Sequence, residues 1–269
     1  MYNYDEIQNC LETKYVGQTF VQFEELKSTH QKAKNISSNC PDGMLVLSEF
    51  QENVKLKNNK YWYALNGDNI YLSIIFKTDG KSDYTTQMLQ IANVSVLETL
   101  KSLDENINCF IKWPNDIYVD DKKICSTFSE YINKKDNSSL IVSIYMNISI
   151  NEDEDNDIRE NINSLRDVLF ANINKEILIS NILNKIEIYY DELLNKETID
   201  KALNIFRNYN LIINKLLGVK KINKKTVRQV KAISINKYGQ IVVKDKNNIE
   251  SLLNKDEDVI EWWMDDKEA

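Results

Sequence analysis

The run from Phe110 to Tyr118 holds the clearest candidate for chemistry in this sequence. It reads Phe-Ile-Lys-Trp-Pro-Asn-Asp-Ile-Tyr, so an apolar, strand-like segment delivers Lys112 and then turns at once. Pro114 fixes its own φ angle, and the Asn-Asp pair after it favours a tight turn. This geometry would hold one cation rigidly at a strand end. The alternative is an ordinary hairpin turn that carries a solvated lysine.

Histidine and cysteine offer few other routes to catalysis. His30 is the single histidine, which excludes a His-rich zinc site and leaves one residue for any Ser-His-Asp or Cys-His mechanism. The four cysteines lie far apart without a Cys-x-x-Cys pair, so we expect reduced, mostly buried thiols. The sequence therefore predicts no metal site of its own, and chemistry that runs on lysine, backbone groups and metal-bound phosphate.

Composition limits the class of protein. The chain has 269 residues, enough for one large domain and a small one, and 42% hydrophobic with 28% charged residues is typical of a soluble globular protein. A net charge of −7 argues against a nucleic-acid surface, although basic residues cluster between positions 220 and 228. No apolar run approaches the roughly 20 residues that span a bilayer. The first residues lack the pattern of a signal peptide, so we expect a cytoplasmic protein.

Hydrophobic periodicity predicts the elements that must position Lys112. Alternating or short apolar runs predict strands, and an apolar residue every three or four positions predicts helices. Ser28, three residues before Gln31, is expected to cap a further helix. In the strand that begins at Leu140, Ser143, Tyr145 and Asn147 share one face. The predicted strands are 20–23, 44–50, 70–76, 109–112, 117–119 and 140–150, and the predicted helices are 89–103, 179–193 and 198–209.

From about Leu216 the sequence changes to short strands, which indicates a small β-barrel. The strands are expected at 219–222, 227–235, 240–244 and 259–263. The fold class is thus predicted to be α+β, with a mixed sheet packed against helices and a small β-barrel at the C-terminal end. Because the first predicted strand begins near residue 20, we expect no helix-turn-helix module before it.

The order of these motifs resembles that of the biotin–protein ligases, over nearly the whole chain. The motifs are Ser28-Thr29, Asn69-Ile70-Tyr71-Leu72-Ser73, Lys112-Trp113-Pro114-Asn115-Asp116 and Lys122-Lys123-Ile124. The resemblance implies a biotin/lipoate ligase-like catalytic domain over residues 1–212 and an SH3-like barrel over 213–269, without an N-terminal DNA-binding domain. The lipoate ligases share the fold, but Trp-Pro-Asn-Asp and the barrel fit the biotin branch better.

The resemblance implies that ATP activates biotin as biotinyl-5′-adenylate, and that biotin then passes to a lysine of a carrier domain. Negative charge must be stabilised while the biotin carboxylate attacks the α-phosphate. Lys112 is the implied catalytic residue, because it would bridge the biotin carboxyl and the phosphate. ATP, Mg²⁺ and biotin are the implied substrates, with no tightly bound cofactor. The implied biotin-binding residues are Ser28, Thr29, Gln51 and Lys112, and the implied ATP and adenylate residues are Lys55, Lys57, Trp62, Asn69 and Asn147.

Several positions depart from the family pattern. Members of the family carry a Gly-Arg-Gly-Arg-Arg-Gly-Arg type of loop before a tryptophan, whereas residues 54–60 contain three lysines and no glycine. Lysine keeps the charge but lacks the planar fork of arginine. The usual Gly-x-Gly-x-Asn is replaced by 143–147, so the Tyr145 ring is expected where the family leaves room for ligand. Cys125-Ser126 replaces an Ala-Gly pair, and His30 replaces the asparagine of Ser-Thr-Asn.

Two functions of different classes follow from this pattern. The first is a biotin–protein ligase whose partner is the biotin carboxyl carrier domain of a biotin-dependent carboxylase. The second is a catalytically degenerate relative that acts as a non-enzymatic binding or regulatory partner. Neither nucleic acid nor a membrane is expected as a partner, and a homodimer through the edge of the main sheet remains open.

Overall fold

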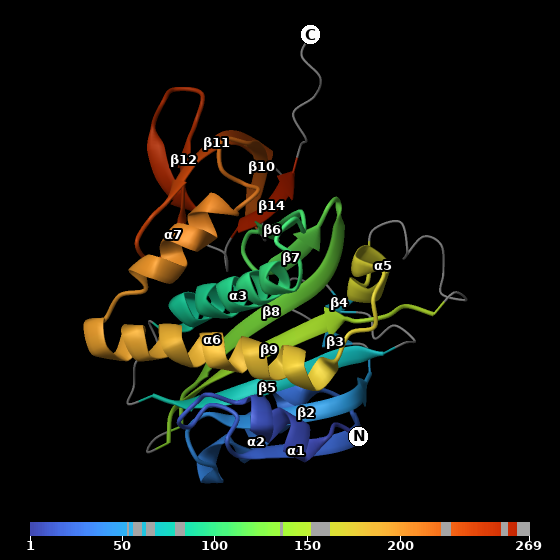
Figure 1. The fold of residues 1–269 in the computed structure, drawn as a ribbon. Helices are drawn as coiled ribbons and strands as arrows, with labels where there is room; N and C mark the ends of the chain where they lie inside the picture. Colours follow the sequence, from blue (N-terminus) through green and yellow to red (C-terminus); the bar gives the residue numbers. More distant parts are fainter. Residues whose placement is uncertain are drawn as a thin grey trace.

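A mixed sheet of seven strands forms the centre of the computed structural model, which describes residues 1–52, 54–55, 61–62, 68–78, 84–134, 137–151, 162–221, 227–253 and 258–262 (Figure 1). The strand order is β1-β2-β5-β9-β8-β7-β6, in which β1 and β2 are parallel and the other neighbours are antiparallel. The strands are β1 (Phe20–Leu26), β2 (Met44–Gln51), β5 (Asn69–Lys77), β6 (Cys109–Lys112), β7 (Asp116–Val119), β8 (Lys122–Ile132) and β9 (Ser139–Asn147).

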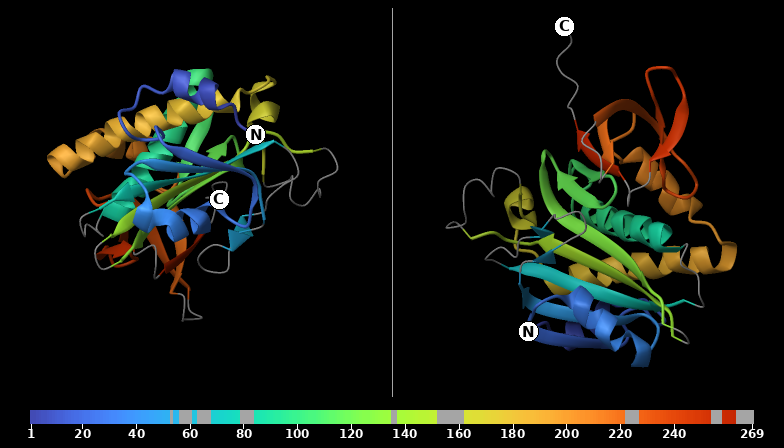
Figure 2. Two further views of the ribbon diagram at one scale, coloured as in Figure 1. Left: turned by 90° about the horizontal axis from the view of Figure 1, so that it is seen from below. Right: turned by 180° about the vertical axis from the view of Figure 1, so that it is seen from behind.

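Helices cover both faces of this sheet (Figure 2). The long helices α3 (Tyr84–Leu103) and α6 (Lys175–Lys196) pack on one face, together with α1 (Tyr4–Cys10), and bury the larger hydrophobic core. On the opposite face, α2 (Thr29–Ile36) packs against β2, β5 and β9 around a small core that includes Ala33 and Ile141. Strands β5 and β9 are therefore buried on both faces.

A second, SH3-like antiparallel sheet follows the helices α5 (Leu165–Leu169) and α7 (Asp200–Asn208). Its five strands follow the order β13-β12-β11-β10-β14. Side-chain hydrogen bonds join this sheet to earlier elements: Trp113 Nε1 donates to the Gly239 carbonyl at 3.4 Å, and Arg207 Nε donates to the Ile235 carbonyl at 2.8 Å. The strands are β10 (Leu216–Lys221), β11 (Val227–Ile235), β12 (Ile241–Lys244), β13 (Glu250–Leu253) and β14 (Asp258–Trp262).

The predicted fold class is confirmed, and the structure adds elements that the sequence pattern did not indicate. The capped helix begins as predicted, since the Ser28 Oγ accepts from the Gln31 backbone N–H. Strand β8 and helix α1 were not predicted. Strand β9 ends at Asn147, because the next two backbone N–H groups both donate to the Asp68 carbonyl instead. Among the described helices, none is long and apolar enough to span a membrane.

Replacing Gly239 with alanine is expected to destabilise the protein by about 1–3 kcal/mol, the range for one strained backbone position. Gly239 has a φ of +77°, and an added Cβ would lie 1.4 Å from the Nε2 of Gln90, a side chain that is 2% exposed. Urea unfolding measures the loss of free energy. A double variant with Gln90→Ala should recover the part of this loss that comes from the clash with Gln90. It should keep the part that comes from backbone strain at position 239. Equal stability of wild type and Gly239→Ala would contradict this account.

Candidate functional site

One row of directly paired residues crosses the sheet from Lys112 to Tyr145. Lys112 pairs with Asp116, Asp116 with Ser126, and Ser126 with Tyr145, which also pairs with Tyr71 on β5. Directly paired residues of antiparallel strands project to the same face, so these side chains share the face that carries α2. Three strand spacings separate the backbone of Lys112 from that of Tyr145, which amounts to about 14 Å. This row suits an elongated ligand with different chemistry at its two ends.

The Lys112 end of the row is a turn held by buried polar side chains. Asn93 on α3 is fully buried, and its Nδ2 donates to the Pro114 carbonyl at 3.0 Å. Its Oδ1 accepts from the Thr127 hydroxyl at 3.0 Å. Asn115 completes the turn, since its Nδ2 donates to the Thr127 carbonyl and its carbonyl accepts from the Thr127 N–H. The backbone around Lys112 is thus fixed from two neighbouring elements, α3 and β8.

Lys112 itself is half-buried at the end of β6. Its Nζ donates to the Tyr118 hydroxyl at 3.5 Å and lies 5.1 Å from the centre of the Tyr118 ring. Burial, followed by the field of Asp116, raises the pKa of Tyr118 to about 12, so the hydroxyl beside Lys112 is neutral at ordinary pH.

Replacing Asn93 with alanine is expected to destabilise the protein by about 1–3 kcal/mol, because the Pro114 carbonyl and the Thr127 hydroxyl lose a buried partner. The variant should also lower any activity that depends on the position of Lys112. Thr127→Val is the matched control, since it removes one of the two bonds while keeping the side-chain shape. Urea unfolding of the two variants and their double variant measures the coupling between them. Full additivity would show that the two residues do not act as one unit.

The opposite end of the row is a buried polar cluster at the start of α2. Thr29 and Gln51 are fully buried, and the Thr29 N–H donates to the Gln51 Oε1 at 3.2 Å. The Ser73 hydroxyl donates to the Thr29 hydroxyl at 3.0 Å and lies 2.7 Å from the Ser143 hydroxyl. Three predicted ligand-binding residues, Ser28, Thr29 and Gln51, therefore meet at one point of the sheet.

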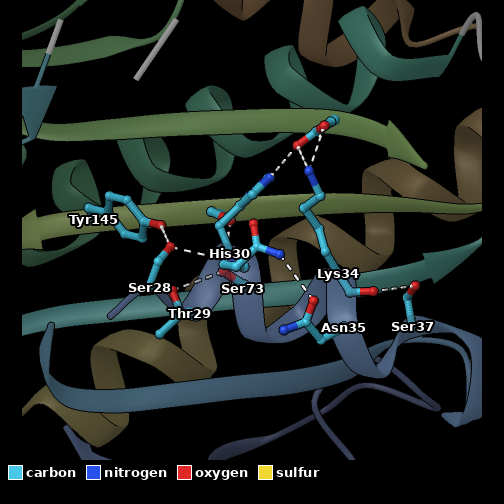
Figure 3. A network of polar contacts seen from close by, with 11 residues as sticks. Ser28, Thr29, His30, Lys34, Asn35, Ser37, Ser73 and Tyr145 are labelled. Atoms are coloured by element: carbon cyan, nitrogen blue, oxygen red, sulfur yellow. Dashed lines mark hydrogen bonds and ion pairs between the residues drawn. The ribbon is translucent and has the colours of Figure 1, made fainter. Parts of the chain in front are cut away.

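Tyr145 reaches this cluster from β9, with its hydroxyl directed toward Ser28 (Figure 3). Its hydroxyl lies 3.4 Å from the Ser28 hydroxyl, and its ring packs edge-on to Tyr71 with ring centres 5.9 Å apart. The side chain is 1% exposed. Burial raises the pKa of Tyr145 above its ordinary value, and the neighbouring Ser28, Thr29 and Gln51 side chains partly offset this. The expectation that Tyr145 shares a face with Ser143 and Asn147 is confirmed, and its phenol fills the space between the predicted ligand-binding residues.

His30 connects this cluster to β8. Its Nδ1 lies 2.7 Å from the Ser143 Oγ, and its Nε2 lies 2.7 Å from an oxygen of Glu130. Lys34, one turn further along α2, donates to both oxygens of the same carboxylate (Figure 3). The His30 hydrogen bond first, opposed by burial and supported by Lys34, lowers the pKa of Glu130 to about 2. Glu130 is thus a carboxylate that can only accept hydrogen bonds.

This lowered pKa predicts how stability depends on pH. The pKa of Glu130 falls on folding from its ordinary 4.5 to about 2, so its contribution to stability is present above pH 4.5 and is lost as the pH falls toward 2. Glu130→Gln should therefore be less stable than wild type at pH 6, and the difference should shrink on acidification. Chemical unfolding between pH 2.5 and 6 tests this. A difference that stays constant over this range would contradict the assignment.

Two further predicted residues, Asn69 and Asn147, face each other across β5 and β9. The Asn69 Oδ1 accepts from the Ile148 N–H at 3.2 Å, which anchors the chain after β9. Asn147 donates through Nδ2 to the Asn163 carbonyl, while its buried Oδ1 has no hydrogen-bond partner among the described residues. The Nε2 of Gln51 is likewise buried without a partner in the described part of the chain. Unpaired buried polar atoms are costly, and a bound ligand is one way to satisfy them.

Lys55, Lys57 and Trp62 are the remaining predicted residues. Lys55 belongs to β3 (Val54–Lys55) and Trp62 to β4 (Tyr61–Trp62), and these two short strands pair antiparallel. Lys57 falls outside the described residues. The structure therefore brings Ser28, Thr29, Gln51, Asn69, Asn147 and Lys112 to one face of the main sheet, and it describes the backbone strands that carry Lys55 and Trp62.

Sequence reasoning did not find Asn93, Thr127, Glu130 or Asn163, which form hydrogen bonds with site residues or with their neighbours. Each acts on a residue more than ten positions away, so no local spacing reveals it. The one available signal was His30 in place of the family's asparagine. A histidine near a buried pocket requires a hydrogen-bond partner for each ring nitrogen.

The sequence is similar to those of known ligases. Residues 24–151 match the biotin/lipoate A/B protein ligase family. The bifunctional ligase/repressor BirA of Bacillus spizizenii is 24% identical over 254 residues, which are 93% of this chain and 77% of that protein.

Solved structures show the same fold. The biotin protein ligase from Aquifex aeolicus in complex with biotin and ATP has a TM-score of 0.76 at 18% identity, covering 91% of this chain and 100% of that one. The biotin protein ligase from Leishmania major in complex with biotin has a TM-score of 0.59 at 18% identity, covering 88% and 98%.

Proposed function

Because the chain belongs to the biotin–protein ligase family, we propose that it activates biotin with ATP and transfers it to a carrier domain. In the first step a biotin carboxylate oxygen attacks the α-phosphate, and pyrophosphate leaves. In the second, the amine of a carrier lysine attacks the acyl carbon, and AMP leaves. The observation that carries the proposal is the Gln51 Nε2, which is buried and has no hydrogen-bond partner among the described residues. It lies at one end of the row whose other end is Lys112.

The two ends of the row suit the two ends of biotin. Biotin has a cyclic urea at one end, an aliphatic chain, and a carboxylate at the other. The urea oxygen would take the place that the Tyr145 phenol oxygen now holds beside Ser28, Thr29 and Gln51. Lys112 would then meet the carboxylate and the α-phosphate, where it stabilises the negative charge that gathers during attack.

The nucleotide would lie on the side of Asn147, whose buried Oδ1 accepts no hydrogen bond from the described residues. Asn69, Lys55, Lys57 and Trp62 are the other residues that we assign to ATP and adenylate, with Mg²⁺ supplied together with ATP. We assign catalysis to residues 1–212 and a supporting role to residues 213–269, whose Gly239 carbonyl accepts from Trp113 beside Lys112. The partner would be the biotin carboxyl carrier domain of a biotin-dependent carboxylase, in the cytoplasm.

One observation favours a second candidate function. The Tyr145 ring is buried and already satisfies the hydroxyl of Ser28, so ligand must displace it. A chain that keeps this ring in place would be a non-enzymatic binding or regulatory partner that retains the ligase fold. The two candidates make opposite predictions for the modification of a carrier.

Transfer to a carrier domain tests the choice between them. The purified chain is incubated with biotin, ATP, Mg²⁺ and a biotin carboxyl carrier domain, and intact-mass spectrometry then measures the carrier. The ligase proposal predicts one added biotinyl group on the acceptor lysine and none on a carrier in which that lysine is arginine. A carrier that gains no mass beside an active reference ligase would favour the binding partner.

A further inference from the structure

A continuous chain of hydrogen bonds runs from His30 to Gln51 through three buried hydroxyls. The His30 Nδ1 lies 2.7 Å from Ser143, Ser143 lies 2.7 Å from Ser73, and Ser73 lies 3.0 Å from Thr29. Thr29 in turn reaches the Gln51 Oε1 at 3.5 Å through its hydroxyl. All four side chains beyond His30 are fully buried, so water does not interrupt the chain.

The protonation of His30 determines the direction of this chain. Glu130 is a carboxylate and accepts from the His30 Nε2, which therefore carries a hydrogen. The Nδ1 then accepts from Ser143 when the ring is neutral, and donates to Ser143 when the ring is charged. Each hydroxyl has one hydrogen to donate, so reversing the hydrogen bond at His30 reverses those that follow it toward Gln51.

The two directions present different groups at Gln51. With a charged ring, Ser143 donates to Ser73, Ser73 to Thr29, and Thr29 to the Gln51 Oε1. With a neutral ring the hydrogen bonds between these side chains reverse direction, and the Thr29 hydroxyl donates to Ser73 and no longer to Gln51. The first direction holds the Gln51 amide by two donors and leaves its Nε2 hydrogens for an acceptor. In the structure the two hydrogen bonds at Thr29 run in the first direction, since Ser73 donates to Thr29 and Thr29 donates to Gln51.

We propose that His30 is a positioning residue that sets the orientation of Gln51 through this chain and makes ligand binding dependent on its protonation. The inference rests on the proposed function only for the identity of the ligand, a molecule with a carbonyl acceptor such as the cyclic urea of biotin. Such an acceptor favours the charged ring. Affinity should therefore fall when His30 loses its proton.

The charged and titratable groups around His30 come from three elements. Glu130 on β8 and Lys34 on α2 form the ion pair beside the ring, and Lys134 contacts the C-terminal end of α2. Tyr145 on β9 lies beside the His30 backbone and stays neutral, because burial raises its pKa. His30 is the single histidine of the chain, so a pH series changes no other imidazole.

Biotin affinity as a function of pH tests the proposal. Isothermal titration calorimetry between pH 5.5 and 8.5 should show wild-type affinity falling by about fivefold or more, the lower end of a typical coupling between two sites. His30→Gln, which does not titrate, should bind with an affinity that is flat over this range. A merely structural role for His30 would lower the affinity of His30→Gln but leave its pH profile parallel to wild type. A parallel profile, or a flat wild-type profile, would overturn the proposal.

A second measurement needs no ligand. With ¹⁵N-labelled histidine and glutamine, the imidazole and the Gln51 side-chain amide should titrate with one midpoint, the Gln51 signal being assigned from its loss in Gln51→Glu. In Ser143→Ala the imidazole should still titrate while the Gln51 amide no longer follows, and Ser73→Ala should behave in the same way. A wild-type Gln51 amide that ignores the titration of His30 overturns the inference, whether or not biotin binds. Coupled titration without any biotin binding would instead contradict the proposed function alone.

Discussion

Replacing Lys112 with alanine is expected to reduce biotinyl-adenylate formation by about 10²–10³-fold, equivalent to about 3–4 kcal/mol of lost transition-state stabilisation. The reason is that one cation is withdrawn from the oxygens on which negative charge gathers. The turn itself should survive, because Asn93, Asn115 and Thr127 hold its backbone without the lysine side chain. Single-turnover formation of the adenylate measures the effect directly.

Two variants separate the charge of Lys112 from other effects. Lys112→Arg keeps the charge with a different shape, so it should retain more activity than alanine but less than wild type. Lys201→Ala removes an exposed helical lysine far along the sequence and should leave the rate unchanged. An adenylation rate in Lys112→Ala equal to that of wild type would show that Lys112 takes no part in the reaction.

Replacing Tyr145 with glycine is expected to raise biotin affinity by at least about tenfold, which corresponds to 1.4 kcal/mol. Biotin would no longer need to displace a buried ring from the cluster of Ser28, Thr29 and Gln51, so the fraction of binding-competent protein rises. The same change should destabilise the free protein by about 3–5 kcal/mol, since a buried aromatic side chain leaves a cavity. Calorimetry gives the affinity, and thermal unfolding gives the stability.

Tyr145→Phe is the matched control, because it removes the hydroxyl and keeps the ring. It should leave biotin affinity near the wild-type value, because the volume of the ring is what excludes the ligand. Saturating biotin should also recover part of the stability that the glycine variant loses, as ligand fills the cavity. Equal affinity of wild type and the glycine variant would show that the ring does not compete with biotin.

Local patterns predicted the parts of the site that a single segment determines. The turn after Lys112 follows from Pro114 and the Asn-Asp pair, and the cap at Ser28 follows from its spacing to Gln31. The common face of Ser143, Tyr145 and Asn147 follows from the two-residue period of a strand. In each case the information lies within a few consecutive residues.

Parts that depend on distant residues could not be predicted in this way. Strand β8 mixes polar and apolar residues without clean alternation, because its first half is buried and its second half is only partly covered. The contact of His30 with Glu130 joins positions 100 residues apart, and Asn93 reaches Pro114 across the turn. Such pairs are set by strand order, which a single sequence does not reveal.

Formation of biotinyl-adenylate by the purified wild-type chain tests the central claim most directly. The protein is incubated with biotin, ATP and Mg²⁺, and mass spectrometry detects the product, with a known ligase beside it as a control. The proposed function predicts biotinyl-5′-adenylate and an equal amount of pyrophosphate. No adenylate from folded protein, while the control ligase is active, would contradict it and identify the chain as a binding partner that keeps the ligase fold.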